Sequence, residues 1–118
     1  MSSQNSRISS RRPLDGRVKV IPPSGPGFDG EIDDVSTGGL AALLDAPLAR
    51  DSICHVYFLL PLDGGQTLVQ ARCRVAGSRP VERVGRYRAG LQFVEFVSDE
   101  TAALRAIGQY IEDAASRA

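Results

Sequence analysis

The stretch SRISSRRPL, residues 6–14, places three arginines within six positions. Arg7 and Arg11 form an R-x-x-x-R pattern, and Arg12 follows directly. A guanidinium is a planar fork of donors that matches the O6 and N7 acceptors of guanine, and its face stacks on aromatic rings. The spacing alone is not specific, because Arg79 and Arg83 repeat it in RPVER. It gains weight only beside a second element that contacts the same ligand.

The segment DVSTGG, residues 34–39, is that second element. Asp34 and Ser36 would share one face of a strand, about 7 Å apart along the chain. A carboxylate beside a hydroxyl accepts hydrogen bonds from the N1–H and N2–H₂ groups of guanine and contacts sugar or phosphate oxygens. Gly39 permits a positive φ and a close backbone approach. Arginines and one carboxylate together predict a site for guanine with phosphate; the structural alternative is a bulge or turn at STGG beside a solvated tail.

Catalytic and metal chemistry find little support in the sequence. His55 is the only histidine, and it lies mid-strand beside Cys54, whereas a nucleophilic triad needs a solvent-open histidine. Neighbouring carboxylates such as Asp33 and Asp34 alternate faces on a strand, so they are not expected to reach one atom. The two cysteines, Cys54 and Cys73, form no CxxC motif, and we expect them to pack as small hydrophobic side chains. We therefore expect neither an enzyme nor a metal site.

Composition points to one small globular domain. The chain has 118 residues, of which 42% are hydrophobic and 24% charged, with a formal net charge of zero. This balance, and the absence of tryptophan, argue against a nucleic acid polymer as partner. Without a long apolar run or a secretory signal, we expect no membrane insertion and a cytoplasmic location.

Short alternating segments predict a mainly β fold. Strands are expected at 17–21, 31–36, 37–47, 52–62, 66–77 and 87–96, and an amphipathic helix is expected after Ser98 as N-cap, with Leu104, Ile107 and Ile111 on its apolar face. Six strands and one helix predict a six-stranded antiparallel β-barrel closed by a C-terminal α-helix. We expect residues 1–12 to form a flexible N-terminal arm and residues 13–116 to form the barrel and helix.

R-x-x-x-R followed by D-x-S-x-x-G resembles the PilZ domain family, bacterial receptors for cyclic di-GMP. RPL and RVKV resemble that family's lead-in to its first strand, and GLQFVEF resembles its last strand before the closing helix. The resemblance extends from about Arg7 to Ile111 and implies the split barrel of that family. It implies that Arg7 and Arg11 clamp guanine and phosphate and that Asp34 binds the guanine edge. It further implies that Ser36 contacts guanine or phosphate and that Gly39 holds the turn, while the adjacent Arg12 lies outside the motif and is expected to assist.

The resemblance implies a cyclic di-GMP receptor or adaptor that is not an enzyme and needs no cofactor besides this ligand. The arginine arm would close over the ligand on the barrel and change the surface offered to an unidentified effector protein. The output would be motility, biofilm formation or polysaccharide export. The alternative is a protein-interaction module of the same fold that binds no nucleotide, as in type IV pilus assembly. The chain is expected to be a monomer or a weak dimer, with the exposed helix face or the RVGRYR loop as the contact.

Overall fold

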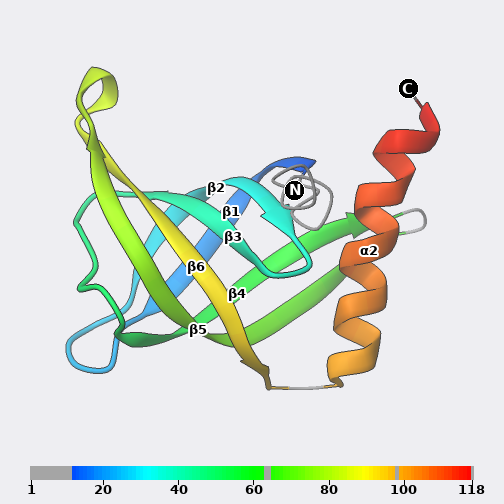
Figure 1. Ribbon diagram of the computed structural model, residues 1–118, viewed down its shortest axis with the longest axis horizontal. Helices are drawn as coiled ribbons and strands as arrows, with labels where there is room; N and C mark the ends of the chain where they lie inside the picture. The colour runs from blue at the N-terminus through cyan, green and yellow to red at the C-terminus, as the bar shows by residue number, and fades with distance from the viewer. Residues whose placement is uncertain (1–11, 63–64, 98, 118) are drawn as a thin grey trace, which may run out of the picture.

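The computed structural model of the chain describes residues 12–62, 65–97 and 99–117. Six antiparallel strands form a closed barrel in the order β1-β2-β3-β6-β5-β4, as Figure 1 shows. The predicted six-stranded barrel with one C-terminal helix is confirmed. The elements are β1 (Arg12–Ile21), β2 (Phe28–Ser36), β3 (Gly39–Leu44), β4 (Ile53–Leu62), β5 (Gly65–Val81), the 3₁₀ turn η1 (Glu82–Val84), β6 (Arg86–Phe96) and α2 (Glu100–Arg117).

Alternation along the strands builds the barrel core. On β4, alternate residues are buried while their neighbours face outward, because successive side chains on a strand point to opposite faces. The predicted inward residues of β4 and β5 are all buried: Cys54, Val56, Phe58, Leu60, Ala71, Cys73 and Val75. Local hydrophobic pattern therefore determined these two strands.

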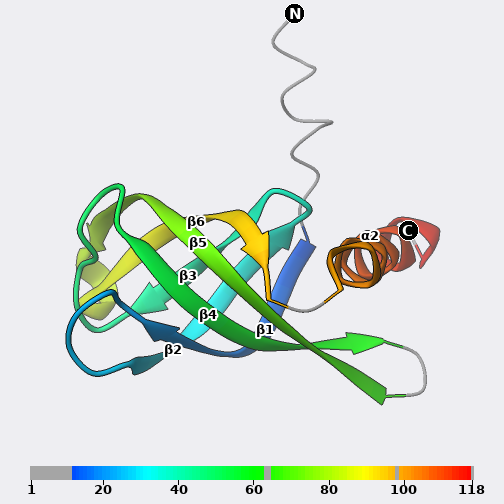
Figure 2. The ribbon, with the colours of Figure 1, turned by 90° about the horizontal axis from the view of Figure 1, so that it is seen from below.

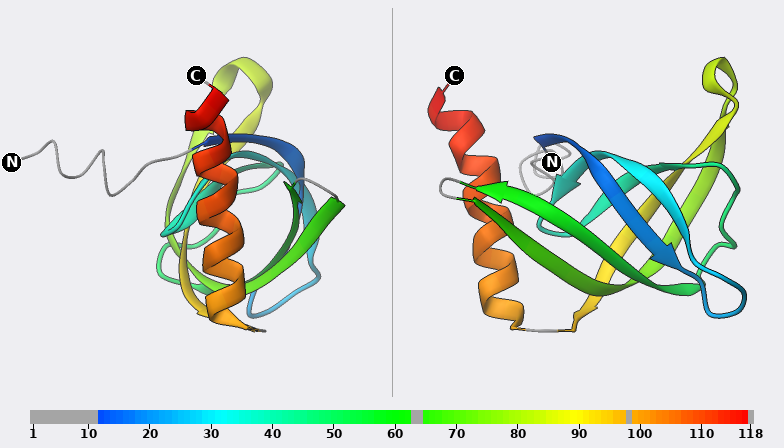
Figure 3. Two further views of the ribbon diagram at one scale, coloured as in Figure 1. Left: turned by 90° about the vertical axis from the view of Figure 1, so that its right-hand side faces the viewer. Right: turned by 180° about the vertical axis from the view of Figure 1, so that it is seen from behind.

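Helix α2 stands across one end of the barrel and covers its core, as both views in Figure 3 show. The helix begins after Asp99, whose Oδ1 accepts a hydrogen bond from the amide of Ala102 at 3.1 Å. Asp99 thus fills the N-cap role expected of Ser98, which lies outside the described residues. The side chains that α2 buries are Ala103, Ala106, Ile107 and Tyr110, whereas Leu104 and Ile111 are only partly buried. No helix in the described part of the chain is long and apolar enough to span a bilayer.

The β5–β6 hairpin extends beyond the barrel wall. Strand β5 runs to Val81, four residues further than predicted, and its end pairs with Arg86 of β6. The turn closes through η1 and Gly85, which has a left-handed φ of 65°. Figure 1 shows this ribbon projecting at the upper left. The extension carries exposed polar residues, so hydrophobic alternation did not reveal it.

The two cysteines are direct cross-strand neighbours, Cys54 on β4 and Cys73 on β5. Both are free and buried. Burial raises the pKa of the Cys54 thiol. The pKa of the Cys73 thiol is raised to about 12, mainly by burial and to a smaller extent by the charge of the neighbouring Cys54 thiolate. Both thiols therefore stay neutral near pH 7, which fits the prediction that they pack as hydrophobes.

Candidate functional site

The first strand brings the arginine-rich stretch to the D-x-S-x-x-G segment. Antiparallel pairing of β1 with β2 sets Arg12 opposite Val35 and Pro13 opposite Asp34. Arg12 therefore begins its strand beside the residue that separates Asp34 from Ser36. Arg7 and Arg11 lie outside the described residues, as does the arm predicted for 1–12 except Arg12 at the start of β1.

A β-bulge places two carboxylates on the outer face of β2. The register with β3 shifts between Ile32 and Asp34, so Asp33 is an extra residue. Ile32 and Val35 are both buried, and Asp33 and Asp34 both face outward between them. The expectation that these two carboxylates alternate faces was wrong, because it assumed a regular strand.

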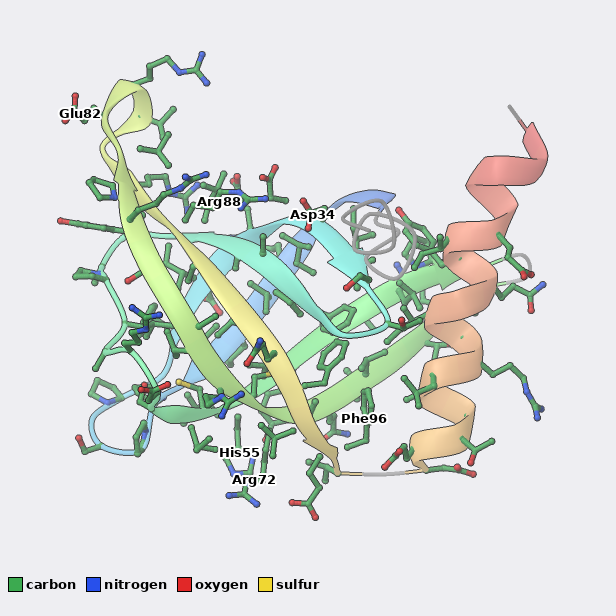
Figure 4. The ribbon with its side chains drawn as sticks, viewed as in Figure 1. Asp34, His55, Arg72, Glu82, Arg88 and Phe96 are labelled. Carbon is green, nitrogen blue, oxygen red and sulfur yellow. The ribbon has the colours of Figure 1, made fainter. Side chains whose placement is uncertain are left out.

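One arginine holds both carboxylates. Arg88 of β6 donates from Nε to Asp33 Oδ2 at 2.8 Å and from Nη2 to Asp34 Oδ2 at 3.0 Å. Figure 4 shows Arg88 and Asp34 on the same side of the barrel. The Asp34 side chain is only 19% exposed. The guanidinium is held between the two carboxylates, and its charge-assisted hydrogen bond to Asp34 Oδ2 restricts where the Asp34 carboxylate points.

Sequence reasoning missed Arg88. Its partners lie 54 and 55 residues away on β2, and β3 stands between β2 and β6. The small side chain of Ala41, which pairs with Asp34 on one side and with Gly90 on the other, leaves room for the contact. The available signal was the pair Arg86 and Arg88 at i and i+2 in the last strand, since these residues share a face.

Ser36 uses its hydroxyl inside the hairpin. It is 3% exposed, it accepts a hydrogen bond from the amide of Gly38 at 3.2 Å, and it donates to the carbonyl of Gly39 at 3.3 Å. This arrangement is a serine turn that closes the connection between β2 and β3. The serine in the motif therefore shapes the turn that carries Asp34.

Gly39 lies where two strands meet closely. A Cβ at this position would lie 2.0 Å from the carbonyl oxygen of Leu91 on β6. Its φ is not positive, unlike those of Gly25, Gly65 and Gly85. The predicted close approach is thus present, whereas the predicted positive φ is not.

The RVGRYR loop, considered for a dimer contact, has two arginines engaged within the chain. Arg86 donates to Asp45 Oδ1, to Glu31 Oε1 and to the Leu43 carbonyl, each at 3.2 Å. Together with Arg88, it ties β6 to the acidic residues of β2 and to the end of β3. These arginines are intramolecular ties between strands.

Other candidate chemistry is absent from this region. His55 is exposed on β4, where its cross-strand neighbours are Ile21 of β1 and Arg72 of β5. Among residues 12–62, 65–97 and 99–117, no three histidine, cysteine or acidic side chains gather to hold a metal ion.

The sequence matches the model of the PilZ domain over residues 5–113. The chain belongs to the PilZ domain family. PilZ domains are regulatory receptor or adaptor modules. No curated protein in the comparison matches the sequence.

Three solved structures share the PilZ fold with this chain. The inhibitor of motility MotI/DgrA from Bacillus subtilis superposes with a TM-score of 0.78 at 14% identity, over 92% of this chain and 51% of that one. MrkH from K. pneumonia, solved as a complex with c-di-GMP, gives 0.66 at 17%, over 92% and 52%. The PilZ domain of CeSA from a cellulose-synthesizing bacterium gives 0.52 at 24%, over 85% and 96%. The chain thus spans about half the length of the first two proteins.

Replacing Arg88 tests its hold on Asp34. In Arg88→Gln, we expect the free energy of unfolding to fall by about 1 kcal/mol, because the pair is partly exposed and its Coulomb energy is screened. For cyclic di-GMP, the ligand that the family resemblance led us to expect, affinity should fall roughly fivefold, because Asp34 loses its fixed orientation. Urea denaturation and calorimetric titration measure the two effects.

Arg72→Gln is the matched control for this test. Arg72 of β5 pairs with Glu95 of β6 at 2.8 Å, so this ion pair also joins two strands but lies away from Asp34. It should lower stability no more than Arg88→Gln and leave affinity unchanged. Equal affinity losses in both variants would contradict a positioning role for Arg88.

Proposed function

We propose that this PilZ domain is a cyclic di-GMP receptor that acts in the cytoplasm as an adaptor. The observation that carries the proposal is the β1–β2 register, which sets Arg12 opposite Val35, between Asp34 and Ser36. Arg11 precedes Arg12 directly in the sequence, so we expect the R-x-x-x-R half of the motif to lie near D-x-S-x-x-G. Family membership and the solved c-di-GMP complex of MrkH support the same ligand.

The proposed division of roles follows the chemistry of the side chains. The guanidinium groups of Arg7 and Arg11, with Arg12 assisting, bind phosphate and stack on guanine. Asp34, held by Arg88, accepts from the N1–H and N2–H₂ edge of guanine. Ser36 and Gly39 contribute to the shape of the wall, because the hydroxyl is turned into the hairpin and the glycine lets β3 approach β6.

Closure of residues 1–12 over the ligand would order backbone at roughly 1–2 kcal/mol per residue. Charge-assisted hydrogen bonds of about 1.5–3 kcal/mol each must offset this cost. Several such bonds are needed together, so binding depends steeply on each arginine. The closed arm would present a new surface to an effector protein, which links the ligand to motility, biofilm or polysaccharide output.

Thermal unfolding with nucleotide tests the proposal. A ligand that binds only the folded state stabilises it by about 2.7 kcal/mol at a hundredfold excess over Kd, which raises Tm by roughly 10 °C in a domain of this size. Cyclic di-AMP is the control, because it keeps the phosphodiester ring and lacks the guanine edge. An unchanged Tm at several hundred micromolar cyclic di-GMP would contradict the receptor assignment.

One observation favours the alternative, a protein-interaction module of the same fold without nucleotide. The Ser36 hydroxyl bonds to the backbone of its own hairpin, at the Gly38 amide and the Gly39 carbonyl. In that case D-x-S-x-x-G would serve the hairpin alone, and the absence of a Tm shift is its expected result.

A further inference from the structure

A second surface lies on the outer face of β4 and β5. Leu59 and Leu68 are directly opposite each other on these strands, and they are 47% and 50% exposed. Pro61, two residues further along β4, is exposed as well. Other exposed hydrophobics among the described residues, such as Val84 at 54%, have no such cross-strand partner. Leu59, Pro61 and Leu68 thus form one apolar strip.

This strip lines a hollow of about 500 Å³ together with Gly16, Arg17 and Tyr57. The hollow has a structural cause: the described pairing of β1 with β4 ends at Val18 and Phe58, so the end of β4 continues without β1 beside it. Figure 2 shows this end of the β4–β5 hairpin beside α2. Phe58, which is buried on the inner side of β4, also lines the hollow.

Cations outnumber acidic groups around the hollow. Arg17, Lys19 and Asp29 line it, and Arg72 and Arg74 lie further along the outer face of β5. Lys19 has Asp29 at 3.8 Å and Arg72 has Glu95 at 2.8 Å. Within the described part of the chain, Arg17 has no acidic partner, and Arg74 bonds only the neutral Gln92. The face therefore carries excess positive charge around an apolar strip.

We propose that this face docks a segment of a partner protein in which apolar side chains stand beside carboxylates. The apolar side chains would fill the hollow against Leu59 and Leu68, and the carboxylates would pair with Arg17 and Lys19. A second copy of the chain fits less well, because a two-fold contact through this face brings its cations against the same cations. A bilayer fits less well, because the apolar strip lines a hollow, whereas interfacial anchors insert protruding side chains.

This surface goes beyond the nucleotide site. Figure 4 shows Asp34 and Arg88 on one side of the barrel and His55 and Arg72, which mark the β4–β5 wall, on the other. The only residue of β2 that lines the hollow is Asp29, at the start of the strand, whereas Asp34 and Ser36 lie at its other end. Docking is thus testable without nucleotide.

The test selects binders for the full chain from a random 12-residue phage-displayed peptide library and measures the synthesised, fluorescein-labelled consensus peptide by anisotropy. We expect the consensus to place Asp or Glu within a few residues of Leu, Ile or Phe. Leu59→Thr with Leu68→Thr, and separately Arg17→Glu, should each weaken binding at least roughly tenfold. Val84→Thr and Arg83→Glu at the tip of the β5–β6 hairpin are matched controls and should change it less than twofold.

Several outcomes would overturn the proposal. The library could yield no peptide, or it could yield peptides rich in Lys or Arg. The selected peptides could also bind the Leu59 and Arg17 variants as tightly as they bind the wild type. Two further results would assign the surface to another occupant. One is a wild-type dimer in sedimentation velocity that is absent in the leucine variant, which would indicate a second copy of the chain. The other is binding of the wild type to phosphatidylglycerol vesicles that the leucine variant loses, which would indicate a membrane. The leucine variant should keep the Tm shift with cyclic di-GMP, so failure of docking and failure of nucleotide binding are separate results.

Discussion

Calorimetric titration of cyclic di-GMP into Arg11→Ala or Asp34→Asn should show a loss of affinity of at least roughly 100-fold. An arginine that binds two acceptors contributes two charge-assisted hydrogen bonds, each about 1.5–3 kcal/mol, and each 1.4 kcal/mol is tenfold in Kd. Asp34→Asn keeps the shape of the side chain but replaces one acceptor with an NH₂ donor, which faces the donors of the guanine edge.

Asp33→Asn and Arg83→Ala are the controls. Asp33 bonds the same Arg88 guanidinium as Asp34 but lies outside the motif, so its loss should cost only a few-fold in affinity. Arg83 is exposed in η1 and tests the general effect of removing a cation. If Asp33→Asn were as damaging as Asp34→Asn, the guanine acceptor would be assigned to the wrong carboxylate.

Gly39→Ala should unfold or severely destabilise the domain, with a fall of about 3 kcal/mol or more in the free energy of unfolding. The added Cβ would lie 2.0 Å from the Leu91 carbonyl oxygen and 3.0 Å from its carbon, and both are backbone atoms. No side chain can rotate away to relieve that contact, so β3 and β6 must separate. Urea denaturation followed by circular dichroism measures the effect.

Gly77→Ala is the matched control for Gly39→Ala. Gly77 also lies in a strand, but a Cβ there meets nothing within 4 Å. The free energy of unfolding of the Gly77→Ala protein should differ from that of the wild type by less than about 1 kcal/mol. A Gly39→Ala protein that folds normally and loses only nucleotide binding would show instead that this glycine serves the ligand and not the contact between β3 and β6.

The carboxylate pair and Arg88 show why local pattern was insufficient at the site. Asp33 and Asp34 reach one guanidinium because a bulge interrupts β2, and a bulge depends on the register with the partner strand. Arg88 reaches them across β3, which requires that β3 pair with β2 on one side and with β6 on the other. Neither fact follows from the residues on either side of Asp34.

The sequence by itself determined the strands whose hydrophobic alternation is strong, the C-terminal helix and the family. Each depends on neighbours along the chain: the period-two pattern of β4 and β5, the helical spacing in α2, and two short motifs in order. Tertiary structure alone decided that Arg88 orients Asp34, that Ser36 turns into its own hairpin and that Gly39 is required for close packing of β3 on β6. The physical reason is that the Arg88 and Gly39 contacts join strands distant in sequence, which only the pairing of β3 with β6 brings within hydrogen-bonding or van der Waals distance. The Ser36 bonds are local, but they form only once β2 and β3 pair as a hairpin.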